Sequence, residues 1–161
     1  MKTTALSKHI LLSCIGIMLL STACRKIKTF PDTPYIEFVS FTKTQLQVPQ
    51  KGILCIYFTD GDGDIGLKPD ENDTSYNFFI DYYEKQNGNF IKIDLEGSHN
   101  ARIPILNSSD YEKPLEGNIE IEIEYNNYIS PYDTIQFECW LVDRAGNTSN
   151  HIFTTPIIVE K

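Results

Sequence analysis

Apolar and polar residues alternate in short runs over residues 35–161, and Gly, Pro, Asn and Asp separate the runs. A period of two is typical of a strand with one buried face, and no segment holds the 3.6-residue apolar spacing of an amphipathic helix. The clearest run, residues 119–125, alternates three isoleucines with three glutamates. The pattern predicts strands at residues 36–41, 45–48, 53–59, 76–83, 90–95, 102–106, 118–125, 134–142 and 152–159.

About seven to nine short strands in roughly 125 residues predict an all-β domain, arranged as an antiparallel β-sandwich of two sheets. We place this domain at residues 35–161. A solenoid is not expected, because no repeat of 20–50 residues is visible. In a sandwich the glutamates of residues 119–125 face solvent and discourage pairing at a sheet edge, although a cation-binding stripe is an alternative explanation for them.

The first 23 residues have the organisation of a secretory signal peptide. Lys2 and Lys8 precede an apolar run at residues 10–20, and small residues follow the run up to Ala23. This run of eleven residues covers only about half of a hydrocarbon core that is roughly 30 Å thick. A permanent membrane-spanning helix is therefore not expected.

Residues 20–24, Leu-Ser-Thr-Ala-Cys, resemble the bacterial lipobox, in which the cysteine is lipidated and becomes the mature N-terminus. The resemblance implies that Cys24 is the lipidation site and that residues 24–34, with two prolines, tether the domain to a membrane anchor. Ser21 departs from the lipobox pattern, which usually has a large aliphatic residue at that position. The alternative to a lipoprotein is an ordinary secreted protein. No acidic residue follows Cys24 directly, so the resemblance implies an outer-membrane lipoprotein that faces the periplasm, with surface exposure left open.

The chain is acidic, with 14 Lys and Arg against 22 Asp and Glu and a net charge of −8. Loss of residues 1–23 removes two lysines and no acid, which leaves the mature chain at −10. Sequence-independent affinity for nucleic acid comes from Lys and Arg that neutralise phosphates. We therefore expect no nucleic-acid partner.

A second resemblance lies at residues 137–149, where an alternating strand ends in Asp-Arg-Ala-Gly-Asn at residues 143–147. Similar Asp-x-Ala-Gly-Asn turns precede the last strand of bacterial immunoglobulin-like and fibronectin-type modules. The resemblance implies an immunoglobulin-like β-sandwich, and Gly146 and Asn147 suit the positive φ of such a turn. It implies no catalytic residues, because these sandwiches host many functions.

Two of the four cysteines remain in the domain, Cys55 and Cys139. In an oxidising envelope they could form a disulfide, since they fall on the two strands that are bridged in true immunoglobulin domains. The alternation favours two separate thiols instead. Cys139 shares a core face with Phe137 and Leu141, whereas Cys55 would point outward if Leu54 and Ile56 face the core. Both alternatives stay open.

The sharpest chemical signal follows the strand at residues 53–59, where Asp60, Asp62 and Asp64 alternate with glycine. Two unit charges about 4 Å apart repel by about 4 kcal/mol at an effective dielectric of 20, so a hard cation would favour closing this loop. The three aspartates and Glu71 match positions one, three, five and twelve of the EF-hand calcium loop. Ile65 takes the glycine position of that pattern, and the preceding strand leaves no room for flanking helices.

The acidic stretch instead resembles the calcium loops that β-rich extracellular proteins place between strands, and we expect Ca²⁺ there, with Asp73 as a further ligand. In a sandwich of this type, the loop after the second strand and the turn at residues 143–147 lie at the same end. Asp143 or Asn147 could then complete the coordination, or Arg144 could pair with the carboxylates in the metal-free state. The alternative is an open acidic turn whose carboxylates point into water.

Motifs of nucleophilic hydrolases, zinc proteases and P-loop enzymes are missing, so we expect no catalysis, with a hydrolase as a distant alternative. Tyr128, Tyr132 and Arg144 are candidate contacts for a protein or glycan partner, because amphipathic rings can bind such surfaces; core packing is the alternative for the tyrosines. The alternating Asp-Gly loop, followed by an aromatic strand, looks like lipoproteins of Bacteroidota. We expect a lipid-anchored envelope module for binding or structure, with a carbohydrate-binding accessory lipoprotein of an outer-membrane glycan-uptake system as the alternative.

Overall fold

The computed structural model describes residues 29–69, 74–106, 113–125 and 128–161. These residues form eight antiparallel strands in two sheets, one of which curves into a half-barrel, and the described part contains no helix. The predicted all-β sandwich of two sheets is thus confirmed. The strands are β1 (Tyr35–Gln45), β2 (Lys51–Asp60), β3 (Phe78–Gln86), β4 (Asn89–Lys92), β5 (Leu115–Glu124), β6 (Thr134–Leu141), β7 (Ile152–Phe153) and β8 (Ile157–Ile158).

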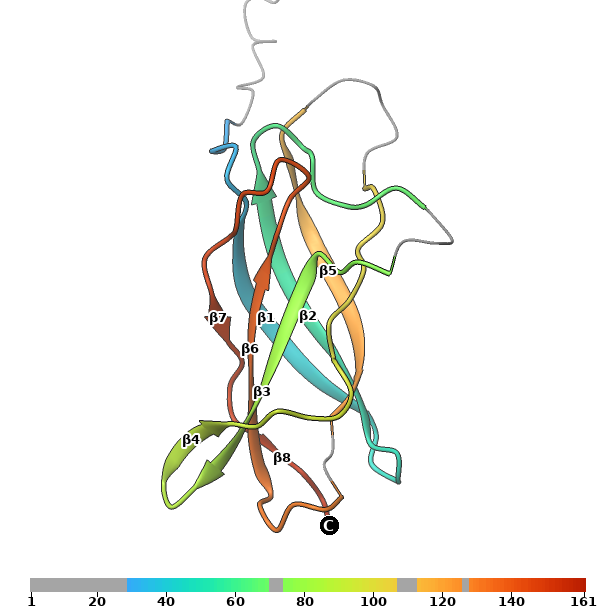
Figure 1. Ribbon diagram of the computed structural model, residues 1–161, viewed down its shortest axis with the longest axis vertical. Helices are drawn as coiled ribbons and strands as arrows, with labels where there is room; N and C mark the ends of the chain where they lie inside the picture. The colour runs from blue at the N-terminus through green and yellow to red at the C-terminus, as the bar shows by residue number, and fades with distance from the viewer. Residues whose placement is uncertain (1–28, 70–73, 107–112, 126–127) are drawn as a thin grey trace, which may run out of the picture.

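The first sheet has the strand order β1-β2-β5, and the second has the order β4-β3-β6-β7, with β8 also paired to β6 (Figure 1). Across the described residues, no helix is long and apolar enough to cross a membrane. The Asn150 side chain links the sheets at one side, because it exchanges two hydrogen bonds of 2.9 Å with the backbone of Ile36 on β1.

The core lies between the sheets and is built by the alternation seen in the sequence. On β2 the inward residues Leu54, Ile56 and Phe58 are almost fully buried, and on β6 every second residue from Ile135 to Leu141 is fully buried. Burial of each such side chain contributes about 1.5–3 kcal/mol to folding. On β5 the isoleucines face the core and the glutamates face solvent, as predicted.

Three predicted strands are wrong or need correction. Residues 46–50 form a turn in place of a strand at 45–48, and residues 102–106 make only an isolated bridge at Pro104. The predicted strand at 152–159 is broken into β7 and β8. A proline lies in each region (Pro49, Pro104 and Pro156), and each lacks the N–H that a strand ladder needs.

The two domain cysteines are separate thiols. Cys55 and Cys139 form no disulfide within the described residues, and they lie in different sheets. Cys139 belongs to the core, whereas Cys55 pairs in register with Ser40 and Glu120 and lies outside the core cluster. The alternative of two unpaired thiols is therefore the one that the fold adopts, and burial raises the pKa of both.

One end of the sandwich gathers segments that are far apart in the sequence. The loop after β2, the connection between β6 and β7, and the N-terminal segment (residues 29–34) meet there (Figure 1). The β3–β4 hairpin and the C-terminus lie at the other end. The fold therefore brings the acidic residues next to the turn at residues 143–147.

Candidate metal centre

The acidic loop (residues 60–66) begins on the most protected strand of the first sheet, β2, which pairs with a neighbour on each side. Asp60 is the last residue of β2 and is 0 % exposed. Its Oδ2 accepts hydrogen bonds from the backbone N–H groups of Asp64 at 2.8 Å and Ile65 at 3.2 Å. A short acidic side chain that bonds to nearby backbone in this way ends the strand and closes the loop on itself.

The glycine between Asp62 and Asp64 is required by the backbone. Gly63 has a φ of +73°, which side chains other than glycine rarely adopt. A Cβ at Gly63 would also collide with the carbonyl oxygen of Lys113, which lies just before β5. The alternation of aspartate and glycine thus lets the loop pack tightly against a neighbouring segment while its carboxylates turn to one side.

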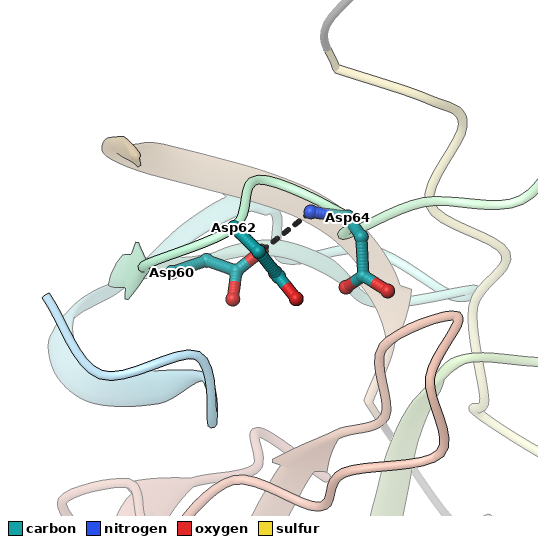
Figure 2. Close-up of side chains that lie close together, drawn as sticks. All are labelled: Asp60, Asp62 and Asp64. Atoms are coloured by element: carbon teal, nitrogen blue, oxygen red, sulfur yellow. Dashed lines mark hydrogen bonds between the residues drawn. The ribbon is translucent and has the colours of Figure 1, made fainter. Parts of the chain in front are cut away.

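The acidic cluster (Asp60, Asp62 and Asp64) is a group of converging carboxylates. One oxygen from each residue lies within 4.8 Å of the others, and Figure 2 shows all three carboxylates on the same side of the loop. Within the described part of the chain, the Oδ1 atoms of all three are buried and have no hydrogen-bond partner. A buried hydrogen-bond acceptor without a partner lowers the stability of the fold by about 1–3 kcal/mol, and by more when the acceptor is charged.

The electrostatics of the acidic cluster disfavour three negative charges. Burial, together with the charge of Asp62, raises the pKa of Asp60 to about 6, against the lowering effect of the two backbone N–H groups. Burial also raises the pKa of Asp64, and the charges of Asp143 and Asp62 add to the shift. Two unit charges about 5 Å apart repel by about 3 kcal/mol at an effective dielectric of 20. A bound cation would remove this repulsion.

The turn at residues 143–147 contacts the acidic loop, as the sequence predicts. The backbone N–H of Ala145 donates to Asp64 Oδ2 at 2.9 Å. Arg144 donates from Nη1 to the carbonyl oxygens of Ile65 at 3.4 Å and Gly66 at 3.2 Å. Arg144 therefore bonds to the loop through backbone carbonyls, while its charge lowers the pKa of Asp64.

Asp143 is held by its own turn. Its carboxylate accepts hydrogen bonds from the backbone N–H of Asn147 at 2.7 Å and from the Asn147 side chain at 2.8 Å. It lies close enough for its charge to raise the pKa of Asp64, but it is not one of the three converging carboxylates. The other predicted site residues Glu71, Asp73 and Cys24 lie outside the described residues.

The predicted contact tyrosines are at the opposite end from the acidic cluster. Tyr128 is half exposed and borders a cavity of about 260 Å³ that is also lined by Val48, Val159, Glu160 and Lys161. Tyr132 is partly buried and borders a different cavity. The structure therefore does not bring the two tyrosines together with Arg144.

Sequence reasoning missed a row of stacked rings on the outer face of the second sheet. Trp140 on β6 stacks between Phe79 on β3, at 5.3 Å between centroids, and His151, at 4.6 Å. His151 also contacts Glu138, at 2.8 Å between Nδ1 and Oε1. The signal was available in the alternation of β3 and β6, which turns Phe79 and Trp140 away from the core as a cross-strand pair. Because the rings stack on one another's faces, we interpret this row as side-chain packing.

The acidic cluster could bind a hard cation such as Ca²⁺. Its donors are all carboxylate oxygens, which suit Ca²⁺ and Mg²⁺, and no His or Cys belongs to the group. Comparison with known proteins gives no independent guide, since no family model, curated protein or solved structure matches the chain. The assignment therefore depends on the geometry of the described residues.

Proposed function

We propose that this protein is a lipid-anchored module of the bacterial cell envelope, an immunoglobulin-like β-sandwich whose acidic loop binds Ca²⁺ and which acts in binding or structure. The observation that carries the metal assignment is the acidic cluster. Three buried carboxylate oxygens, one from each aspartate, have no partner among the residues that the structure describes. A cation would supply the missing partner for all of them at once.

Calcium fits the acidic cluster better than magnesium. Ca²⁺ takes six to eight oxygen ligands in a flexible geometry and accepts bidentate carboxylates and backbone carbonyls. Mg²⁺ demands a near-octahedral shell and keeps several waters, which suits an open site. Asp60 is fully buried and the Asp64 side of the cluster is covered by the turn at residues 143–147, so the surroundings favour the ion that sheds its water more readily.

The strand order supports the immunoglobulin-like assignment. The sheets β1-β2-β5 and β4-β3-β6-β7 correspond to strands A-B-E and C′-C-F-G of that sandwich type. The turn between β6 and β7 then takes the place of the F–G loop and the acidic loop that of the B–C loop. In that fold these two loops lie at the same end, in agreement with the hydrogen bond from Ala145 to Asp64.

The anchor is proposed from the lipobox resemblance at Cys24. Residues 29–34 precede β1 and lie at the same end of the sandwich as the acidic loop (Figure 1). A chain lipidated at Cys24 would therefore present the calcium site on the side where its tether enters. The proposed location, an outer membrane with the domain facing the periplasm, depends on the lipobox resemblance and on the absence of an acidic residue directly after Cys24.

Isothermal titration calorimetry of the purified protein in detergent with CaCl₂ tests the metal assignment. We expect one saturable site, with weaker calcium binding in Asp62→Asn, where a neutral amide oxygen replaces a carboxylate oxygen, and unchanged binding in Asp94→Asn. Asp94 is exposed and follows β4, so the control makes the same charge change away from the cluster. Asp62 makes the better test because, among the described residues, its carboxylate accepts no backbone hydrogen bond of the kind that Asp60 accepts. Equal calcium binding by the two variants would contradict the assignment.

A second candidate function is glycan binding at Tyr128. The observation that favours it is the half-exposed ring beside a cavity of about 260 Å³, with Glu160 and Lys161 as polar groups on its rim. An amphipathic ring next to polar side chains is a typical sugar contact. Retention on immobilised polysaccharides that is lost in Tyr128→Ala, and kept in Tyr76→Ala, would support this candidate. Tyr76 is exposed to a similar extent and does not line that cavity.

A further inference from the structure

The N-terminal segment (residues 29–34) is docked against the acidic loop. The backbone N–H of Gly61 donates a hydrogen bond of 2.8 Å to the carbonyl oxygen of Pro31. Pro34, at the end of the segment, is fully buried. Figure 2 shows this segment as a blue trace beside the three aspartates. The segment is therefore held by the domain where it enters.

The docking leaves no space for a side chain at position 61. A Cβ on Gly61 would lie 2.6 Å from the carbonyl oxygen of Pro31 and would also collide with the carbonyl oxygen of Phe30. Both obstacles are backbone atoms, which cannot rotate away as the end of a flexible side chain can. Glycine at this position is thus a requirement of the docked segment.

Gly61 is also the residue between Asp60 and Asp62. The loop conformation that offers the Gly61 N–H to Pro31 is the same conformation that brings the carboxylates of the acidic cluster together. A cation that favours the converged carboxylates must therefore favour the docked segment, because the two features share one stretch of backbone. Repulsion among unneutralised carboxylates opposes both.

We infer that Ca²⁺ binding at the acidic cluster controls the docking of residues 29–34 on the domain. This inference rests on the calcium site proposed above and adds a regulatory consequence to it. With calcium bound, the segment is held against the acidic loop. Without calcium, the loop relaxes and the segment is released from Gly61.

The consequence concerns the orientation of the domain. Residues 29–34 connect the sandwich to the part of the chain that carries Cys24. A docked segment fixes where the chain leaves the domain, whereas a released segment adds several residues to the tether. Calcium would thus switch the domain between a shorter and a longer tether to its anchor.

Hydrogen–deuterium exchange of the full-length protein in detergent tests the inference. We expect the backbone amide of Gly61, which donates to the Pro31 carbonyl, to exchange roughly tenfold more slowly in CaCl₂ than in EGTA, because calcium reduces the local opening of this contact. Amides of the β3–β4 hairpin at the far end should exchange equally in both conditions. In Asp62→Asn, the exchange of the Gly61 amide should respond less to calcium than in the wild type.

A variant on the contact itself gives a second test. Gly61→Ala should release residues 29–35 in both conditions, and by thermodynamic linkage it should weaken calcium binding by the factor by which calcium favours docking. Gly97→Ala is the matched control, since a Cβ there meets no atom within 4 Å and its φ is ordinary. The control should keep the wild-type exchange and affinity.

The failures of the two proposals can be told apart. If no calcium binding is seen by calorimetry, the proposed calcium site is wrong. If calcium binds and the exchange of the Gly61 amide stays the same in CaCl₂ and EGTA, the site stands and the inferred control of docking is overturned.

Discussion

The backbone N–H of Ala145 donates a 2.9 Å hydrogen bond to Asp64 Oδ2, and this contact joins two loops that are 81 residues apart in the sequence. Asp64 follows the central strand of the first sheet, and Ala145 follows β6 of the second. The acidic loop therefore bridges the two sheets at the end where residues 29–34 enter. An ion bound there would stabilise the packing of one sheet on the other as well as the loop itself.

Neutralising one member of the acidic cluster should stabilise the metal-free protein. In Asp62→Asn the repulsion falls, so we expect the free energy of unfolding in EGTA to rise by about 1 kcal/mol. The gain in stability that calcium gives to the wild type should be smaller in the variant, because a neutral amide oxygen binds calcium more weakly than a carboxylate. Urea unfolding in EGTA and in CaCl₂ measures the stability without metal and the gain from calcium. The control Asp94→Asn should behave as the wild type. A variant that is less stable than the wild type in EGTA and gains as much stability from calcium as the wild type would count against the account.

Arg144 should substitute in part for the cation. Its side chain bonds to the carbonyl oxygens of Ile65 and Gly66, and its charge lowers the pKa of Asp64. In Arg144→Gln we expect the metal-free protein to lose about 1 kcal/mol of stability and the calcium-induced rise in Tm to become larger. Lys85→Gln removes a charge at the distal hairpin and serves as the control. An unchanged or smaller calcium response in Arg144→Gln would contradict this prediction.

Much of the fold could be predicted because it depends on local alternation. The pattern at residues 119–125 and the buried positions of β6 follow from a period of two. The irregular structure around Pro104 could not be predicted from the apolar content of residues 102–106, because a strand has a similar content of apolar residues. The meeting of the acidic loop with the turn at residues 143–147 followed from the sandwich topology.

The finer geometry of the site depends on long-range contacts that no local pattern encodes. The engagement of Asp143 by Asn147 is a property of the folded turn. The docking of Pro31 on Gly61 joins segments that are 30 positions apart. The sequence pattern predicts only a tether at residues 24–34, with no contact to the domain. In the sequence, Gly61 is one of several glycines in a predicted turn. The close approach of the Phe30 and Pro31 backbone explains why glycine is needed at position 61.

His99 should make stability depend on pH. The ring packs on Tyr82 and Phe137, and its Nε2–H donates to the Glu124 carbonyl at 2.8 Å. Burial lowers the pKa of His99, against smaller raising effects of Glu124. Because the unfolded chain protonates at about pH 6.5, this contribution is complete above that pH and is lost as the pH falls below it.

The difference between the wild type and His99→Gln isolates this contribution. Urea unfolding at pH 7.5 and pH 5.5 should show that the wild type loses more stability on acidification than the variant does. Both proteins share the other titrating groups, so these cancel in the comparison. An equal loss in the two proteins would mean that His99 is not held neutral by the fold.

Cys24 should decide membrane association. In Cys24→Ala the lipidated thiol is absent, and without acyl chains the acidic chain has little affinity for a bilayer. We expect the variant in the soluble envelope fraction and the wild type in the membrane fraction after cell fractionation. Cys14→Ala changes a thiol inside the predicted signal peptide and should stay with the membrane. Persistent membrane association of Cys24→Ala would show that the lipobox resemblance misleads.

The most direct test of the central claim is a crystal structure of the protein grown in CaCl₂. The account predicts one Ca²⁺ bound by oxygens of Asp60, Asp62 and Asp64 at about 2.3–2.6 Å, with the turn at residues 143–147 beside it. The same crystals should show the Gly61–Pro31 hydrogen bond. Carboxylates that turn apart into solvent, with no ion between them at millimolar calcium, would contradict the account.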